Sequence, residues 1–147
     1  MKPKFLYHGS QYPLQTIVPQ QARDSTERGS RLGIYACEHA NDTIRFALPI
    51  RWYPDNPSGK RVWSCLPDGK LIIEHGSINP FSVGYIYKIS SENFEMIDDW
   101  QWLSEKEAEV ISREEIKVED YWHLITFSPQ ALAANKLLYP SDTLYIN

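Results

Sequence analysis

The sequence predicts an α+β protein built on mostly antiparallel sheets. Short runs rich in β-branched and aromatic residues outnumber the helical patterns. These runs do not alternate regularly with helices, as the strands of a doubly wound parallel sheet would. The chain has 147 residues, of which 42% are hydrophobic, and this is the size of one domain with one core. We therefore expect a single domain over residues 1–147.

The first third of the chain contains two predicted strands and one predicted helix. The strands are expected over residues 4–9 and 33–37, and the polar residues 11–33 between them predict a surface loop. Apolar residues then recur at helical spacing over residues 38–48. Pro49 follows this stripe and ends the predicted helix.

The rest of the chain reads mainly as strands. The tripeptide Pro67-Asp68-Gly69 is a turn signal, so the runs on either side of it predict a hairpin. Ser128 followed by Pro129 is typical of a helix start. The elements expected after the hairpin are a strand over 83–90, a short helical turn over 104–107, strands over 108–112 and 121–127, and a helix over 129–138.

Charge and cysteine content narrow the class of protein. The net charge is −4, from 15 basic and 19 acidic side chains, which argues against sequence-independent binding of nucleic acid. Cys37 and Cys65 form no metal-ligand pattern, and we expect both to be reduced. The apolar run near the N-terminus is too short for a signal peptide or a membrane span. We therefore expect a soluble cytoplasmic protein.

One of the four histidines stands out by its context. His39, His75 and His123 are each expected to be surface residues or locally hydrogen-bonded. His8 instead ends a predicted strand, directly before Gly9 and Ser10. Because glycine has no Cβ, a ligand can approach its backbone closely, and a flat amide could pair with its N–H and C=O groups. The alternative interpretation is a strand end followed by a simple turn.

Further motifs resemble the ADP-ribosyltransferase superfamily, in particular its His–Tyr–Glu branch. His8-Gly9-Ser10 is similar to the first motif of that branch, and Gly33-Ile34-Tyr35 to the second. Thr43 and Phe46 stand eight and eleven positions after the tyrosine, where the family has a small hydroxyl residue and an aromatic residue. The resemblance implies an ADP-ribosyltransferase-like fold: two mostly antiparallel sheets packed as a split sandwich with a few flanking helices.

The third motif of the branch is a glutamate on a later strand. Glu109, in "EKEAEVIS", is our candidate because it begins a Val-Ile strand after a short turn. Glu107 is the alternative, since strand alternation places both residues on one face. Glu105 falls in the predicted turn and is the weakest of the three.

The resemblance implies that NAD is the substrate and that no metal takes part. Cleavage of the nicotinamide–ribose bond develops positive charge on the ribose, which the Glu109 carboxylate would stabilise. The flat, cationic nicotinamide would stack on Tyr35, with Phe46 as the other wall. The remaining ligand-binding residues are Gly9 and Thr43 for the carboxamide, His8 for the adenosine ribose, and Ser10 beside them in the first motif.

The family transfers ADP-ribose to varied acceptors, so we expect a macromolecular acceptor, either protein or nucleic acid. The loops 11–32 and 50–82 are the expected determinants, with Arg23, Arg28 and Arg31 available to contact a pyrophosphate or nucleic acid. A small mono-ADP-ribosyltransferase would suit a toxin or effector, with a neutralising antitoxin as a further partner. Two alternatives remain open: an RNA 2′-phosphotransferase-like enzyme, and a catalytically inactive binding domain of this fold.

Overall fold

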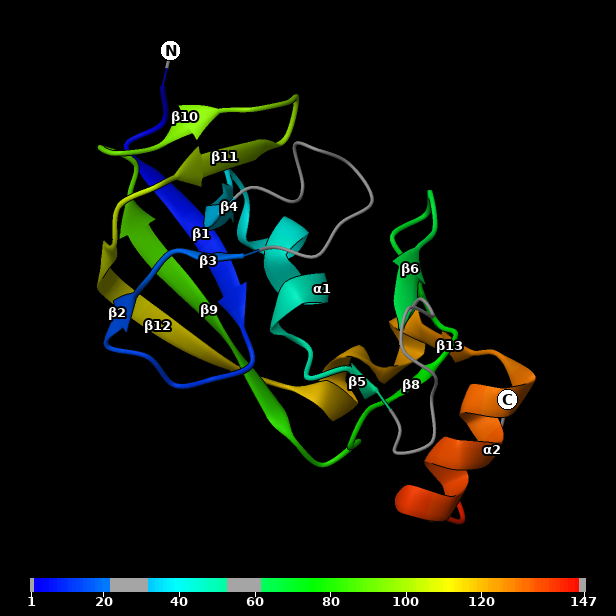
Figure 1. Ribbon diagram of the computed structural model, residues 1–147. Helices are drawn as coiled ribbons and strands as arrows, with labels where there is room; N and C mark the ends of the chain where they lie inside the picture. The colour runs from blue at the N-terminus through cyan, green and yellow to red at the C-terminus, as the bar shows by residue number, and fades with distance from the viewer. Residues whose placement is uncertain (1, 22–31, 53–61, 146–147) are drawn as a thin grey trace. The chain divides into compact units, whose positions relative to one another are not determined.

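The computed structural model describes residues 2–21, 32–52 and 62–145 (Figure 1). It confirms the α+β class with mostly antiparallel sheets and few helices. The chain divides into two compact units, each made of two stretches. Unit 1 comprises Met1–Ala47 and Gly84–Ile116, and unit 2 comprises Leu48–Val83 and Lys117–Asn147. The single domain over residues 1–147 stays a prediction.

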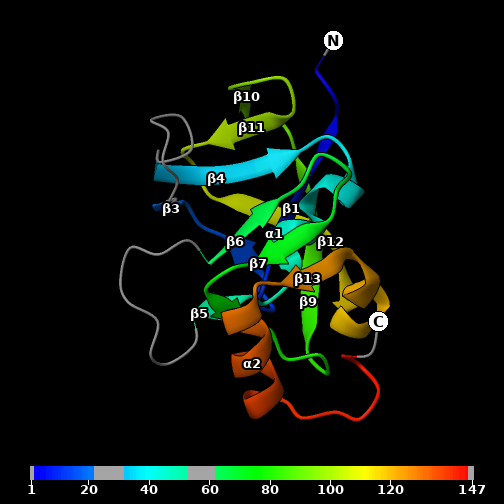
Figure 2. The same ribbon diagram turned by 90° about the vertical axis from the view of Figure 1, so that its right-hand side faces the viewer.

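Unit 1 is built on one eight-stranded sheet. The strand order is β10-β11-β4-β1-β9-β12-β2, and β3 also pairs with β4. Figure 2 shows β11 and β3 on opposite sides of β4. The bounds are β1 Phe5–Ser10, β2 Thr16–Ile17, β3 Gln20–Gln21, β4 Leu32–Cys37, β9 Val83–Ser90, β10 Glu95–Met96, β11 Gln101–Ser104 and β12 Ala108–Lys117.

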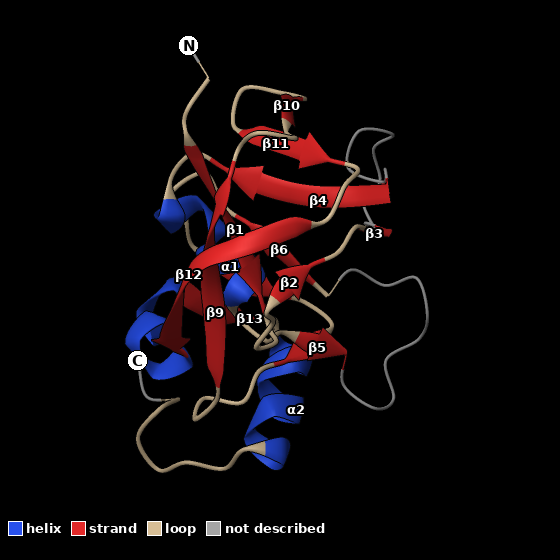
Figure 3. Ribbon diagram, turned by 90° about the vertical axis from the view of Figure 1, so that its left-hand side faces the viewer, coloured by secondary structure: helices blue, strands red, loops and turns tan. Residues whose placement is uncertain are grey.

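A short stretch of chain joins two distant strands of this sheet. β2 pairs with β12, where Thr16 faces Glu109. Only two residues further on, β3 pairs with β4, where Gln20 faces Gly33. The segment from β2 to β3 therefore connects the two ends of the layer β4-β1-β9-β12, and Figure 3 shows it crossing between them. It encloses one face of that layer.

The enclosed face carries the core of unit 1. Leu6 on β1 faces Ile89 on β9, and both side chains are fully buried. Since successive strand residues point to opposite faces, the side chains of His8 and Ser10 lie on this same face. The other buried members of the core cluster are Ile17, Ile34, Ala36, Tyr87, Phe94, Trp102 and Ala108.

The outer face of β1 and β9 is covered by a short helical segment. The predicted helix is a 3-10 turn, η2 Ala40–Thr43, followed by α1 Ile44–Ala47. It packs directly on two glycines: a Cβ on Gly9 would overlap the Thr43 carbonyl and lie 2.9 Å from the Ala47 nitrogen. A Cβ on Gly84 would overlap the Ala47 carbonyl. The glycines therefore permit the close approach of helix and sheet.

Unit 2 consists of two small sheets and a C-terminal helix. The predicted hairpin is confirmed: β6 Trp63–Cys65 and β7 Leu71–Ile73 are antiparallel, and Gly69 in their turn has φ of 87°. β13 Ile125–Phe127 adds to β7 in parallel (Figure 2). The predicted C-terminal helix is also confirmed as α2 Pro129–Leu138, and Ser128 Oγ accepts from the Ala131 N–H at 3.1 Å. β5 Arg51–Trp52 pairs with β8 Gly76–Ser77.

Two local predictions are wrong, and one pair of strands was not predicted. The strand expected over 121–127 is a strand only from Ile125, because η3 Val118–Leu124 is a 3-10 helix. The helical turn expected over 104–107 is absent: Ser104 ends β11, and its hydroxyl bonds to the backbone of Lys106 instead. The pair of β10 and β11 was not predicted, although β11 lies beside β4.

Candidate functional site

Unit 1 contains a cavity of about 370 Å³ at the end of β1. Its size lies at the lower end of the range for small-molecule sites. The end of β1, the start of β4, the residue Phe46 on α1, and the segment 11–18 form its walls. The described lining residues are His8, Gly9, Ser10, Gln11, Tyr12, Leu14, Thr16, Ile17, Val18, Gly33, Ile34 and Phe46.

The cavity lies where β1 and β4 part. β9 pairs with β1 along its whole length, whereas the described β1–β4 register consists of Tyr7 facing Cys37. The Ser91 N–H donates to the Lys4 carbonyl at 3.2 Å, in continuation of the β1–β9 ladder. Because bonded and non-bonded pairs alternate along an antiparallel ladder, the backbone groups of Gly9 point away from β9. They face the opening between β1 and β4.

His8 is fixed by a hydrogen bond to the neighbouring strand. Its Nδ1 lies 2.7 Å from the backbone carbonyl of Tyr35. Burial lowers the pKa of His8 below 6.5, although the bond to Tyr35 acts in the opposite direction. The ring is therefore neutral at pH 7. A carbonyl only accepts, so Nδ1 carries the proton and Nε2 is left as an acceptor. Such an atom suits a ligand hydroxyl.

The described lining of the cavity contains no Asp, Glu, Lys or Arg side chain. Phe46 lines it instead, and its ring is stacked on that of Trp100, which is not among the described lining residues, with centroids 6.4 Å apart and an interplanar angle of 9°. Both side chains are partly exposed, and the Arg45 guanidinium lies 5.2 Å from the Trp100 ring. This environment favours a flat group with hydrogen-bonding edges over a phosphate.

Two of the residues predicted to bind NAD, Tyr35 and Thr43, are not among the described residues that line the cavity. Tyr35 contributes its carbonyl to His8. Thr43 is 1% exposed, and its hydroxyl donates to the Ala40 carbonyl at 2.7 Å. A larger residue at Gly9, such as valine, would disturb the fold, because α1 and η2 occupy the space of a side chain there.

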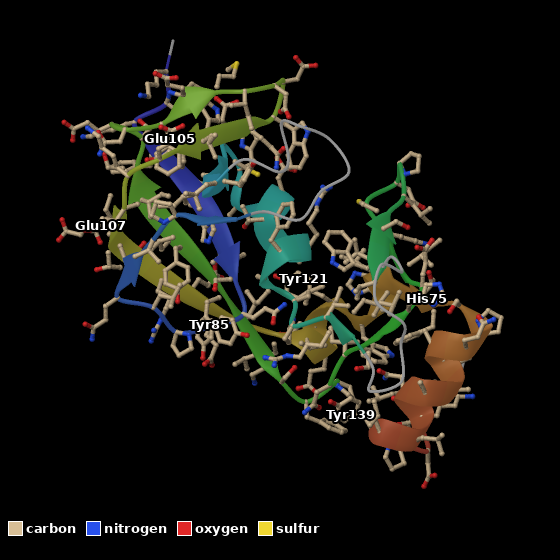
Figure 4. The ribbon with its side chains drawn as sticks, viewed as in Figure 1. His75, Tyr85, Glu105, Glu107, Tyr121 and Tyr139 are labelled. Atoms are coloured by element: carbon tan, nitrogen blue, oxygen red, sulfur yellow. The ribbon has the colours of Figure 1, made fainter. Side chains whose placement is uncertain are left out.

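The candidate carboxylates lie in a second hollow of unit 1. Glu107 and Glu109 are exposed and line a space of about 240 Å³, together with Glu92. In Figure 4 the Glu107 side chain projects outward from the sheet, away from α1. Glu109, however, is the cross-strand partner of Thr16, which lines the first cavity. The neighbouring pair, Ala108 and Ile17, is buried in the core, so the side chains of Thr16 and Glu109 point to the opposite, exposed face of the sheet.

Trp100 was not predicted as a site residue. The residue follows a turn in which the Asp98 carboxylate accepts from the N–H groups of Trp100 and Gln101, at 3.0 and 2.8 Å. An Asp side chain that accepts from the backbone N–H two residues on is typical of such a turn. That signal predicts the turn, but the stacking on Phe46 depends on the β11–β4 pairing.

Cys37 and Cys65 are both free thiols. Burial, with Asp42 and Asp98 nearby, raises the pKa of Cys37 to about 12, which makes it a poor nucleophile.

Within residues 2–21, 32–52 and 62–145, no three His, Cys, Asp or Glu side chains are placed to hold a metal. Arg23, Arg28 and Arg31 lie outside the described residues. No helix of the described chain is long and apolar enough to span a membrane.

Comparisons with known proteins identify no relative. No family model, no curated protein and no solved structure matches this chain.

Proposed function

We propose that the protein is an NAD-dependent mono-ADP-ribosyltransferase with an ADP-ribosyltransferase-like fold. The single observation that carries the proposal is the cavity at the parting of β1 and β4. Its lining includes His8, Gly9 and Ser10 of the first motif, Gly33 of the second, and Phe46 from the segment that follows the second motif. The described lining residues carry no charge, which supports binding of the nicotinamide nucleoside end of NAD.

The proposed roles follow from the chemistry of each group. His8 Nε2 accepts a hydrogen bond from a ribose hydroxyl. The backbone of Gly9 pairs with the carboxamide, and Phe46 with Trp100 provides the aromatic surface for the cationic ring. The bond between ribose C1′ and the nicotinamide nitrogen breaks with its electron pair going to nicotinamide. Glu109 stabilises the positive charge on the ribose until an acceptor attacks C1′ and loses its proton.

The test measures nicotinamide released from NAD by the purified protein. We expect release by the wild type and a loss of about 100-fold or more in Glu109→Gln, as for removal of one group that stabilises charge in the transition state. Glu107→Gln is the matched control, since it lines the same hollow. Release that persists in Glu109→Gln but fails in Glu107→Gln would transfer the role to Glu107.

The acceptor is proposed to be a macromolecule, either protein or nucleic acid. Incubation with labelled NAD and a mixture of protein, DNA and RNA identifies the class by the fraction that keeps the label. Label in one of these fractions supports the transferase. Free nicotinamide without any labelled macromolecule would instead indicate transfer to water.

A non-catalytic NAD-binding domain is the second candidate. The observation that favours it is the placement of both carboxylates outside the described lining of the His8 cavity. It predicts saturable NAD binding with no nicotinamide release at any acceptor concentration.

A further inference from the structure

Tyr87 lies behind the cavity on the strand next to His8. It faces His8 directly in the β1–β9 register, so the two side chains lie on the same face of the sheet. Tyr87 is 0% exposed and belongs to the core cluster. Neither the sequence motifs nor the proposed chemistry gives this residue a role.

The phenol of Tyr87 holds the loop that forms much of the cavity. Its hydroxyl donates to the Tyr12 carbonyl at 2.5 Å and accepts from the Leu14 N–H at 2.6 Å. Both distances are at the short end for such bonds. Six of the twelve described lining residues come from residues 11–18. The buried hydroxyl therefore fixes the backbone at residues 12–14, within the segment that supplies half of the described lining residues.

We propose that Tyr87 is a positioning residue for the ligand of this cavity. It fixes the backbone of residues 12–14 and thereby the distance between this loop and His8. The ring packs in the core, while the hydroxyl determines the shape of the site. The claim that the ligand is NAD rests on the proposed function; the claim that Tyr87 orders the loop does not.

The experiment compares Tyr87→Phe with Tyr85→Phe. Both variants keep the ring, and Tyr85 lies two residues away on the same face of β9, packed beside the core. Tyr87→Phe should raise KM for NAD about 10-fold, the factor expected from loss of about one hydrogen bond's free energy. We expect kcat to stay within about 2-fold, because the reacting groups are unchanged. Tyr85→Phe should change neither parameter.

A second measurement does not depend on NAD. Hydrogen exchange at the Leu14 amide should be faster in Tyr87→Phe than in the wild type, while Tyr85→Phe leaves it unchanged. Leu14→Pro removes the same bond from the loop side, since proline has no N–H, and should reproduce the increase in KM.

The outcomes separate the two claims. Faster Leu14 exchange together with a raised KM supports the proposal. A lower unfolding midpoint with unchanged KM and unchanged exchange would overturn it, because Tyr87 would then serve only the core. If the wild type releases no nicotinamide, the proposed function fails, and Leu14 exchange alone then decides whether Tyr87 orders the loop.

Discussion

Two hollows of unit 1 differ in chemistry although one strand pair links them. The cavity at His8 is lined by uncharged described residues, whereas the hollow at Glu109 collects three glutamates. Thr16 and Glu109 face each other across β2 and β12, so each hollow contains one residue of the same cross-strand pair. Under the proposed function, the two hollows divide the roles: the cavity at His8 binds the nicotinamide nucleoside, and the hollow at Glu109 supplies negative charge.

His8→Ala should have the largest effect on binding. The variant removes the acceptor Nε2 and leaves the Tyr35 carbonyl without its donor, so NAD affinity should fall about 10- to 100-fold. Equilibrium titration with NAD measures it. The exposed His39 provides the control, and His39→Ala should bind as the wild type does. Equal affinities of the two variants would mean that the uncharged cavity does not bind NAD.

Gly9→Ala should destabilise unit 1 by about 1–3 kcal/mol, the usual cost of overpacking. The new methyl group would overlap the Thr43 carbonyl. Ser10→Ala, one residue further along β1, should change the free energy of unfolding much less. Denaturant titration compares the two. A Gly9→Ala protein as stable as Ser10→Ala would show that α1 does not press on β1.

The native state should lose stability below the ordinary pKa of His8. Because the folded pKa lies below 6.5, the unfolded chain takes up a proton first as the pH falls. The penalty is therefore absent well above pH 6.5 and grows as the pH falls through that value toward the folded pKa. Unfolding midpoints between about pH 8 and about pH 5 should fall less steeply for His8→Gln than for the wild type. Identical slopes would contradict a buried, neutral His8.

Glu107→Gln should have the smallest effect. The residue precedes β12 and has an exposed side chain, so nicotinamide release and NAD affinity should each change less than about 2-fold. A larger loss of release would indicate that the acidic hollow acts through Glu107 as well as, or in place of, Glu109.

Local signals in the sequence predicted several elements of this fold. Ser128 and Pro129 determine the start of α2 by capping, and Gly69 determines the turn of the β6–β7 hairpin through its positive φ. Both depend on one or two residues. β11 was missed because its stability comes from pairing with β4, a partner more than 60 residues away in the sequence. The 3-10 helix at Val118–Leu124 was likewise hidden by a strand-like composition.

The candidate site was predictable to a similar extent. The sequence placed His8, Gly9 and Phe46 in one site, and the structure brings them to one cavity. The close packing of α1 against Gly9 was not predicted, because that contact depends on tertiary structure. The loop 11–18 and its anchor Tyr87 were also missed, since their hydrogen bonds join residues more than 70 positions apart.

The most direct test of the central claim is the change in hydrogen exchange when NAD is added to the wild-type protein. The account predicts slower exchange at amides within residues 8–18 and 33–34, the backbone that lines the uncharged cavity, and no change in β6 or β7. Unchanged exchange around His8 at saturating NAD, or protection confined to another region, would contradict it.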